Sequence, residues 1–233
     1  MSGTLYIVAT PIGNLEDMTH RAVRILQEVN CIACEDTRQT KILLDHYNIH
    51  NRMTSFFEHN ELRKIPELLA MLEEGQSIAV VSDAGTPTIS DPAFKLVREA
   101  REKKIPVVPV PGANAALAAL CAAGLPTDSF VFAGFLPQKK GRRGAWQKMV
   151  EEDRTIILYE SPFRILKMLE EIETHFGGRT IVVARELTKK FEEFLEGSAA
   201  ELKKHFEKHP PRGEFVILIT GKKYFEKYGD EQS

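Results

Sequence analysis

Residues 77–92 read Ser77-Ile-Ala-Val-Val-Ser-Asp-Ala-Gly-Thr-Pro-Thr-Ile-Ser-Asp-Pro92, an apolar run followed by a loop of small residues. The apolar run predicts a buried strand, and Asp91 and Pro92 stand where a helix N-cap and the first helical residue belong. The segment is therefore predicted to form strand, loop and helix, with the carboxylate of Asp83 at the mouth of the loop. Because ligands bind beyond the carboxyl ends of strands in open parallel sheets, we expect a ligand site here.

The rest of the chain continues the same alternation. In the first half we expect strands near residues 5–10, 30–34 and 105–110, the last near a sheet edge because it contains prolines, and helices after Thr19, over 37–46 and over 61–74. In the second half we expect strands at 130–135, 155–159, 180–184, 191–196 and 214–220, with helices after Pro162 and Ser198. The strands at 180–184 and 191–196 are too close in sequence for a helical crossover, so we expect an antiparallel pair there.

Size and charge limit the possible classes of protein. The chain has 233 residues and a formal net charge of -2, which favours two domains and excludes a general attraction to polyanions. We predict domains over residues 1–115 and 116–223, followed by a flexible tail at 224–233. Because no apolar run approaches the roughly 20 residues that cross a bilayer, we expect a cytoplasmic protein. Cys31 and Cys34 lie within a predicted strand, which favours buried thiols over a zinc or redox pair.

Four predicted strands of the first half end in polar loops of small residues. The loops contain Thr10-Pro-Ile-Gly-Asn-Leu15, Glu35-Asp-Thr-Arg38, Ser82-Asp-Ala-Gly-Thr-Pro87 and Val110-Pro-Gly-Ala-Asn114. Each alone is as consistent with a tight turn, but parallel neighbouring strands would bring all four to one edge. The glycine-rich phosphate motifs GxGxxG and GxxxxGK[ST] do not occur, so the loops favour a ligand with hydroxyl and amino groups, such as S-adenosylmethionine.

The second half has charged loops of its own. Two follow predicted strands, at Leu158-Tyr-Glu-Ser-Pro-Phe-Arg164 and Val183-Ala-Arg-Glu-Leu-Thr-Lys-Lys190. A third segment, Pro137-Gln-Lys-Lys-Gly-Arg-Arg-Gly144, places four cations ahead of Trp146. These cations are consistent with an arm that contacts RNA phosphates while Trp146 stacks on a base, and equally with a solvated loop and a buried Trp146.

Together these motifs resemble the tetrapyrrole methylase superfamily and, within it, the ribosomal RNA small subunit methyltransferase I family. The matching segments are Thr10 to Leu15, Cys34 to Arg38, Val81 to Pro92, Val110 to Asn114, Tyr159 to Pro162 and Ala184 to Thr188. The resemblance implies an α/β fold of two domains, with a mainly parallel first sheet and a mixed second sheet. It also implies a homodimer, S-adenosylmethionine in the cleft between the domains, and 2′-O-methylation of a cytidine in 16S rRNA, in the decoding region of the small ribosomal subunit.

The same resemblance implies the site residues. The cofactor contacts transfer to Pro11, Asp83, Gly85, Thr86, Ala113, Asn114, Leu158, Tyr159 and Ala184. Two positions depart from the family pattern: Asn114 replaces a serine or threonine, and Ala93 stands where a glycine is common. Because residue 93 is predicted to be helical, the alanine is expected to be harmless.

The chemistry requires an acceptor for the proton of the ribose hydroxyl. The candidates are Glu35, Asp36, Glu160 and Glu186, and the sequence does not choose among them. The candidate RNA-binding residues are Arg38, Lys139, Lys140, Arg142, Arg143 and Arg185. Two alternatives remain open, a methyltransferase for a tetrapyrrole or another small acceptor, and a non-catalytic module that binds the cofactor or RNA.

Overall fold

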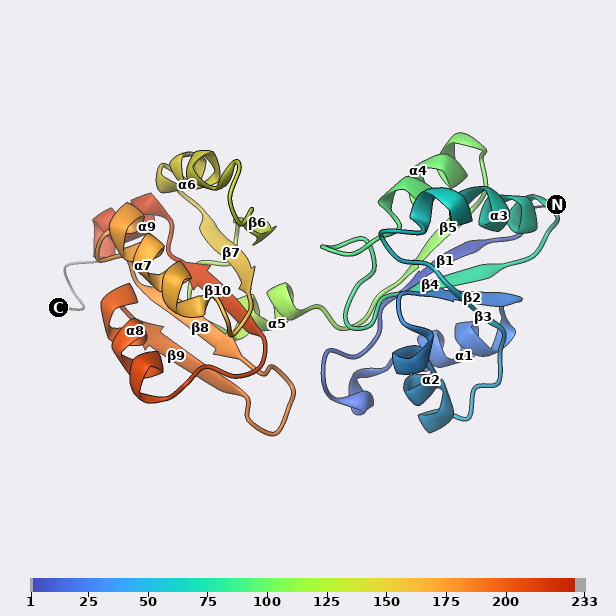
Figure 1. The fold of residues 1–233 in the computed structure, drawn as a ribbon, viewed down its shortest axis with the longest axis horizontal. Helices are drawn as coiled ribbons and strands as arrows, with labels where there is room; N and C mark the ends of the chain where they lie inside the picture. Colours follow the sequence, from blue (N-terminus) through green and yellow to red (C-terminus); the bar gives the residue numbers. More distant parts are fainter. Residues whose placement is uncertain (1, 229–233) are drawn as a thin grey trace. The chain divides into compact units, whose positions relative to one another are not determined.

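The computed structural model describes residues 2–228, and residue contacts divide the chain into two units, Met1–Asn114 and Ala115–Ser233 (Figure 1). The first unit contains strands β1 (Leu5–Val8), β2 (Cys31–Cys34), β3 (Met53–Ser55), β4 (Ile78–Val81) and β5 (Val107–Val110). Its helices are η1 (Leu15–Asp17), α1 (His20–Glu28), α2 (Thr37–His46), α3 (Glu61–Glu73) and α4 (Phe94–Glu102). Strand β3 has no counterpart among the sequence predictions.

The first unit is a parallel sheet covered on both faces. The strand order is β3-β2-β4-β1-β5, and β5 lies at an edge as predicted. Alternate residues of each strand enter opposite cores: Ile32 packs with α1 and α2, and Ala33 packs with α3 and α4. Figure 1 shows these two helix pairs on opposite faces of the sheet. Thr19 caps α1 as predicted, its side chain accepting a hydrogen bond of 3.1 Å from the N–H of Ala22.

The second unit contains a mixed sheet. Its strands are β6 (Phe130–Phe135), β7 (Thr155–Glu160), β8 (Ile181–Arg185), β9 (Glu193–Gly197) and β10 (Phe215–Ile219). Its helices are α5 (Ala115–Ala122), α6 (Arg142–Val150), α7 (Ile165–Phe176), α8 (Ala199–Lys208) and α9 (Lys222–Tyr228). The strand order is β6-β7-β10-β8-β9, and β8 pairs antiparallel with β9 as predicted.

Helices α6, α7 and α8 cover one face of this second sheet, where Trp146, Ile165 and Phe206 join the core. Helix α5 contacts β7 and β10. Residues 222–228 of the tail region form helix α9, which differs from the flexible segment expected from residue 224 onward, and residues 229–233 lie outside the described residues. Among the helices of residues 2–228, none combines the length and apolar character needed to span a bilayer.

The start of α4 differs from its prediction. The helix begins at Phe94 rather than at Pro92, and Asp91 does not cap it. The cap position is Ala93, whose backbone is left-handed with φ 99° and whose N–H donates to Oε1 of Glu61 over 3.2 Å. The buried Glu61 carboxylate therefore replaces the expected cap, and the alanine at position 93 is strained rather than helical.

Ala93→Gly is therefore expected to stabilise the protein by about 0.5–1 kcal/mol. A left-handed backbone costs a residue with a Cβ about 1–2 kcal/mol, and loss of the buried methyl group offsets part of this gain. Urea denaturation measures the change. The matched control is Ala100→Gly, at a buried helical position of α4, which is expected to destabilise by about 1 kcal/mol. Destabilisation by both substitutions would contradict the strain assigned to Ala93.

Candidate functional site

Four polar loops meet at one edge of the first sheet, as the sequence predicts. Strands β2, β4, β1 and β5 are parallel neighbours in that order, so their carboxyl ends point the same way. The loops that follow them contain the predicted residues from Thr10, Glu35, Ser82 and Val110 onward. The edge therefore has the arrangement that open α/β sheets use for ligands.

Hydrogen bonds fix three of these loops to one another. The backbones of Thr10 and Gly85 exchange N–H···O bonds of 2.9 and 3.0 Å. The Thr86 hydroxyl donates to the carbonyl of Ala113 over 3.1 Å and accepts from the Asn114 amide over 3.4 Å. The Asn114 amide, at the position that departs from the family pattern, therefore contacts the Thr86 loop.

Two glycines keep side chains away from this edge. Gly85 has φ +82°, a conformation that favours glycine, and lies between Ile12 and Ala113. A Cβ at Gly112 would come within 2.9 Å of the Cβ of Ala9. Pro11 is buried in the adjacent loop. The resulting edge presents backbone groups and small side chains to a ligand.

Asp83 and Asp36 connect the loops after β4 and β2. Asp83 is exposed, and its Oδ1 accepts the N–H of Asp36 over 3.0 Å. Asp36 caps α2, and hydrogen bonds from Arg38 lower the pKa of this carboxyl to about 2. The Arg38 side chain is 88% exposed and pairs with Asp36 over 2.6 Å.

Glu35 and Asp91 form an acidic pair beside Asp83. They line a cavity of about 10 Å³, together with Ser82 and apolar residues, which is close to the space that one water molecule needs. Burial, with repulsion from Asp83, raises the pKa of Glu35. Burial, with repulsion from Glu35, raises the pKa of Asp91 to about 6. Two carboxyl groups whose pKa values move toward neutrality at a loop edge make this edge a candidate functional site.

Asp91 is the residue of this site that the sequence did not reveal. The run Ser90-Asp91-Pro92 has the sequence pattern of a helix start, so Asp91 is predicted to be a helix cap. In the structure its carboxyl group instead interacts electrostatically with Glu35. The non-glycine residues Thr88, Ser90 and Ala93 all have positive φ, so the loop takes a path that residue propensities do not suggest.

Asp91→Asn is expected to remove part of the pH dependence of stability. The pKa of Asp91 is about 6 in the folded protein, above the ordinary aspartate value of 3.8, so the folded state binds more protons than the unfolded state. Wild-type stability therefore falls as the pH rises from about 4 to about 6. Urea denaturation at about pH 8 should show the variant to be more stable by about 1 kcal/mol, after allowance for solvent screening, with no gain at about pH 4. Asp45→Asn, at an exposed position of α2, is the control. An Asp91→Asn curve parallel to wild type would contradict the assignment.

The second unit places its predicted cofactor residues within the sheet. Leu158 and Ala184 are buried in β7 and β8, so their side chains face protein. Tyr159 is half-buried, and its hydroxyl accepts the N–H of Ala116 over 3.1 Å. Tyr159 and Ala184 lie on either side of Val216 of β10, because both of them pair with this residue across the sheet.

The two candidate acids of the second unit, Glu160 and Glu186, are both paired with cations. The buried Glu160 accepts from the N–H of Ser161 and from Nε of Arg164, each over 2.7 Å. Although burial opposes the change, hydrogen bonds from Lys189 and the backbone of Glu214 lower the pKa of Glu186. These ion pairs give Glu160 and Glu186 structural roles.

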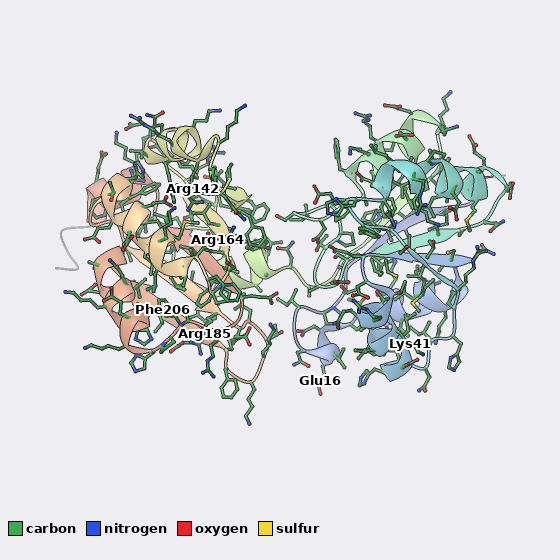
Figure 2. All side chains as sticks on the ribbon, in the orientation of Figure 1. Glu16, Lys41, Arg142, Arg164, Arg185 and Phe206 are labelled. Carbon is green, nitrogen blue, oxygen red and sulfur yellow. The ribbon has the colours of Figure 1, made fainter. Side chains whose placement is uncertain are left out.

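The basic segment combines an exposed part with a part that is built into helix α6, and Trp146 is buried, as the second of the two predicted alternatives has it. Arg142 begins helix α6 and is buried, with its Nε 2.9 Å from Oε2 of Glu171. Trp146 is 1% exposed, stacks with His175 and donates to Glu171, so it is not available to stack on a base. Arg142 is therefore a structural residue, because Glu171 neutralises it, whereas Lys139, Lys140 and Arg143 remain exposed. Figure 2 labels Arg142, Arg164 and Arg185 in this unit.

Arg185 also has an ion-pair partner. It lies 3.4 Å from Glu193 of β9, and its Nε is buried without a hydrogen-bond partner among the described residues. It is half-buried at the end of β8. Its guanidinium is therefore positioned by the sheet rather than extended into solvent.

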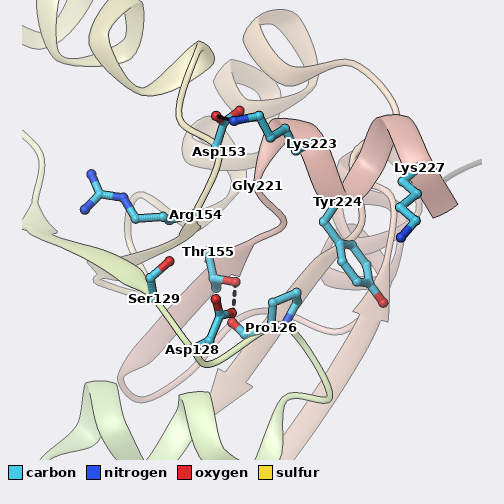
Figure 3. Close-up of a pocket in the computed structure, with 10 residues that line it drawn as sticks. All are labelled: Pro126, Asp128, Ser129, Asp153, Arg154, Thr155, Gly221, Lys223, Tyr224 and Lys227. Atoms are coloured by element: carbon cyan, nitrogen blue, oxygen red, sulfur yellow. Dashed lines mark hydrogen bonds and ion pairs between the residues drawn. The ribbon is translucent and has the colours of Figure 1, made fainter.

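A cavity of about 250 Å³ lies elsewhere in the second unit (Figure 3). It is lined by Thr155, at the start of β7, and by Arg154, Lys223, Tyr224 and other polar residues. Lys223 is paired with Asp153. None of the predicted site residues lines this cavity, and its position at the opposite end of β7 from Glu160 separates it from the charged loops.

The two cysteines of β2 are buried thiols, as the sequence favours. Cys31 and Cys34 are both buried, and burial raises the pKa of Cys34 to about 11. Within residues 2–228, no group of three His, Cys, Asp or Glu side chains is placed to hold a metal ion.

Comparison with known proteins places this architecture in a family. Residues 4–203 match the Tetrapyrrole (Corrin/Porphyrin) Methylases. A ribosomal RNA small subunit methyltransferase I of Escherichia coli O157:H7 is 51% identical over 229 residues, which cover 97% of this chain and 80% of that protein. The protein of the same name from Thermotoga maritima is 46% identical over 220 residues, which cover 94% of this chain and 99% of that protein.

Solved structures show the same fold at low sequence identity. A diphthine synthase has a TM-score of 0.74 at 14% identity, and the match covers 94% of this chain and 90% of the diphthine synthase chain. The uroporphyrin-III C-methyl transferase of Thermus thermophilus, complexed with S-adenyl homocysteine, has a TM-score of 0.65 at 16% identity. The match covers 94% of this chain and 97% of that protein. The two sheets, the loop edge and these matches together establish that the chain belongs to the tetrapyrrole methylase family and, within it, to the ribosomal RNA small subunit methyltransferase I family.

Proposed function

We propose that this methyltransferase transfers a methyl group from S-adenosylmethionine to the ribose 2′-hydroxyl of a cytidine in 16S rRNA, in the decoding region of the small ribosomal subunit. The observation that carries the proposal is the 51% identity over 97% of the chain to a ribosomal RNA small subunit methyltransferase I. The proposal includes a cytoplasmic homodimer, since its substrate is assembled in the cytoplasm and the family resemblance implies two copies.

The loop edge of the first unit fits the methyl donor. S-adenosylmethionine, when bound, supplies an electrophilic methyl carbon on a positively charged sulfonium. The exposed carboxylate of Asp83 complements that charge, and it can also accept hydrogen bonds from amino or hydroxyl groups. Gly85 and Gly112 allow close approach of the backbone, and the fixed contact between Thr86 and Ala113 holds the loops in place.

The second unit offers the donor fewer groups. Leu158 and Ala184 would contribute through the strand backbone, because their side chains are buried. Tyr159 offers a half-buried ring whose hydroxyl is fixed by Ala116. We therefore assign the dominant polar contacts to Asp83, Thr86 and Asn114.

Glu35 is our choice for the proton acceptor. Its pKa is raised by burial and by Asp83, and a base whose pKa lies nearer to the working pH accepts a proton more effectively. Asp36 is weakened as a base, since hydrogen bonds from Arg38 hold its pKa at about 2. Glu160 and Glu186 are held in ion pairs. The exposed guanidinium of Arg38 keeps donors available for a flanking phosphate.

Methyl transfer from labelled S-adenosylmethionine tests the proposed function. The acceptors are small ribosomal subunits from cells that lack the gene, naked 16S rRNA, and a tetrapyrrole. Labelling of the subunits or the rRNA at a ribose is expected. Labelling of the tetrapyrrole alone would assign the chain to small acceptors, and tight donor binding without transfer to any acceptor would support a non-catalytic module.

A further inference from the structure

Three phenylalanines lie at one edge of the second sheet and are largely exposed. Strands β6, β7 and β8 run in the same direction, because β6 pairs parallel with β7 and both β7 and β8 pair antiparallel with β10. Phe135 ends β6, Phe163 follows β7 and Phe191 follows β8, so all three belong to the loop edge at the carboxyl ends of these strands. Their exposed fractions are 53%, 95% and 63%.

The loop that carries Phe163 is firmly held. The buried Glu160 carboxylate receives the Ser161 N–H and the Arg164 guanidinium, and the Arg164 N–H donates to the Ser161 carbonyl over 3.1 Å. These bonds fix the residues before and after Phe163 in the chain. The Phe163 side chain itself is almost fully exposed to solvent. An exposed aromatic ring on a fixed loop binds a partner at a small cost in conformational entropy.

The loop that carries Phe191 is held in the same manner. Lys189 pairs with Glu186 over 3.0 Å, and the N–H of Glu192 donates to the carbonyl of Lys189 over 3.1 Å. The ammonium of Lys190 lies 5.6 Å from the centre of the Phe191 ring. This ring therefore stands beside a cation, as it would in a site that binds an aromatic base next to a phosphate.

Four cations without ion-pair partners belong to the same edge as the rings. Among residues 2–228, no ion pair involves the side chains of Lys139, Lys140, Arg143, Lys190 or Arg212. Lys139 and Lys140 follow β6, Lys190 follows β8, and Arg212 precedes β10, so these four belong to the same edge as the rings. By contrast, Arg142, Arg164 and Arg185 are neutralised by Glu171, Glu160 and Glu193.

We propose that this edge binds a single-stranded segment of RNA, with bases stacked on Phe163 and Phe191 and phosphates contacted by the unpaired cations. The proposal rests on the proposed function, and it names residues that recognise the substrate. Strands β7 and β8 are separated by β10, so the strand ends from which the two ring-bearing loops start lie about 10 Å apart. Separate exposed rings at an edge that also carries unpaired cations suit stacked bases and a charged backbone better than they suit a protein partner, which would bind a continuous apolar patch.

The test measures the affinity of Phe163→Ala and Phe191→Ala for RNA by fluorescence anisotropy. The probe is a labelled single-stranded RNA of mixed sequence, about 16 nucleotides long, the upper site size of a single-strand-binding domain. Each substitution is expected to weaken binding by about 5- to 150-fold without changing the slope of affinity against salt. Phe163→Trp should preserve binding. The control is Phe130→Ala, at the opposite end of β6, and thermal denaturation verifies that every variant is folded.

A double variant, Lys139→Ala with Lys140→Ala, separates charge from stacking. It should weaken binding and reduce the slope of log affinity against log salt by about 1.4, the value for two phosphate contacts on a single strand. An RNA strand of the same length without bases provides the converse test. The phenylalanine variants should bind it as wild type does, while the lysine variant should bind it more weakly.

The outcomes separate this inference from the proposed function. Normal RNA binding by both phenylalanine variants, in a wild-type protein that methylates rRNA, would overturn the stacking assignment alone. Equal losses for the base-bearing and base-free strands would also overturn it, because the rings would then act through the structure of the loops. Absence of RNA binding and of rRNA methylation in wild type would overturn the proposed function as well.

Discussion

Glu35→Gln is expected to lower kcat by about 10²- to 10⁴-fold, the contribution that a positioned general base makes. Glutamine preserves the size of the side chain but cannot accept the proton of the ribose hydroxyl. Glu35 is half-buried next to Asp83 and Asp91, and this environment raises its pKa. Single-turnover methyl transfer to small ribosomal subunits measures the loss, and calorimetry should show unchanged affinity for the donor.

The pH profile gives this prediction a second readout. In wild type, the rate should rise with pH as Glu35 ionises, and the raised pKa places this rise above the ordinary range of a glutamate. Removal of the neighbouring Asp83 charge in Asp83→Asn should move the rise to lower pH when the rate is measured at saturating donor. Normal turnover by Glu35→Gln, together with a large loss in Glu160→Gln or Glu186→Gln, would transfer the role of base to the second unit.

Asp83→Asn is expected to weaken the binding of S-adenosylmethionine by about 10- to 100-fold, the effect of losing a charge-assisted hydrogen bond and the attraction to a cation. Asparagine is the informative substitution, since its carbonyl oxygen can still accept the Asp36 N–H that now binds Oδ1 of Asp83. The connection between the β2 and β4 loops is therefore preserved. Titration calorimetry measures the affinity, with Asp45→Asn as the surface control. Unaltered affinity would remove Asp83 from the donor site.

Local sequence signals were sufficient for most of the fold. The apolar run before Ser82 and the small residues from Asp83 to Pro87 predict a strand and a loop without reference to the rest of the chain. The predicted gathering of four loops at one edge is confirmed, because β2, β4, β1 and β5 are parallel neighbours. The order of those strands depends on long-range pairing, which no local pattern encodes.

Features that depend on distant partners were not predictable. A run of four cations gives no sign that Glu171 neutralises Arg142, and the burial of Trp146 follows from the packing of α6 against α7. The pair of Glu35 and Asp91 likewise forms between loops far apart in sequence. Ala93 shows the same limitation, because a buried Glu61 from α3 caps α4 in place of the local Asp91.

Mass-spectrometric mapping of 16S rRNA from cells with and without this gene tests whether the chain methylates a ribose of this RNA. One ribose methyl group on a cytidine of the decoding region should be absent without the gene, should return with the wild-type chain, and should stay absent with Glu35→Gln. An identical set of ribose methyl groups in both strains would contradict the assignment of this chain as an rRNA methyltransferase.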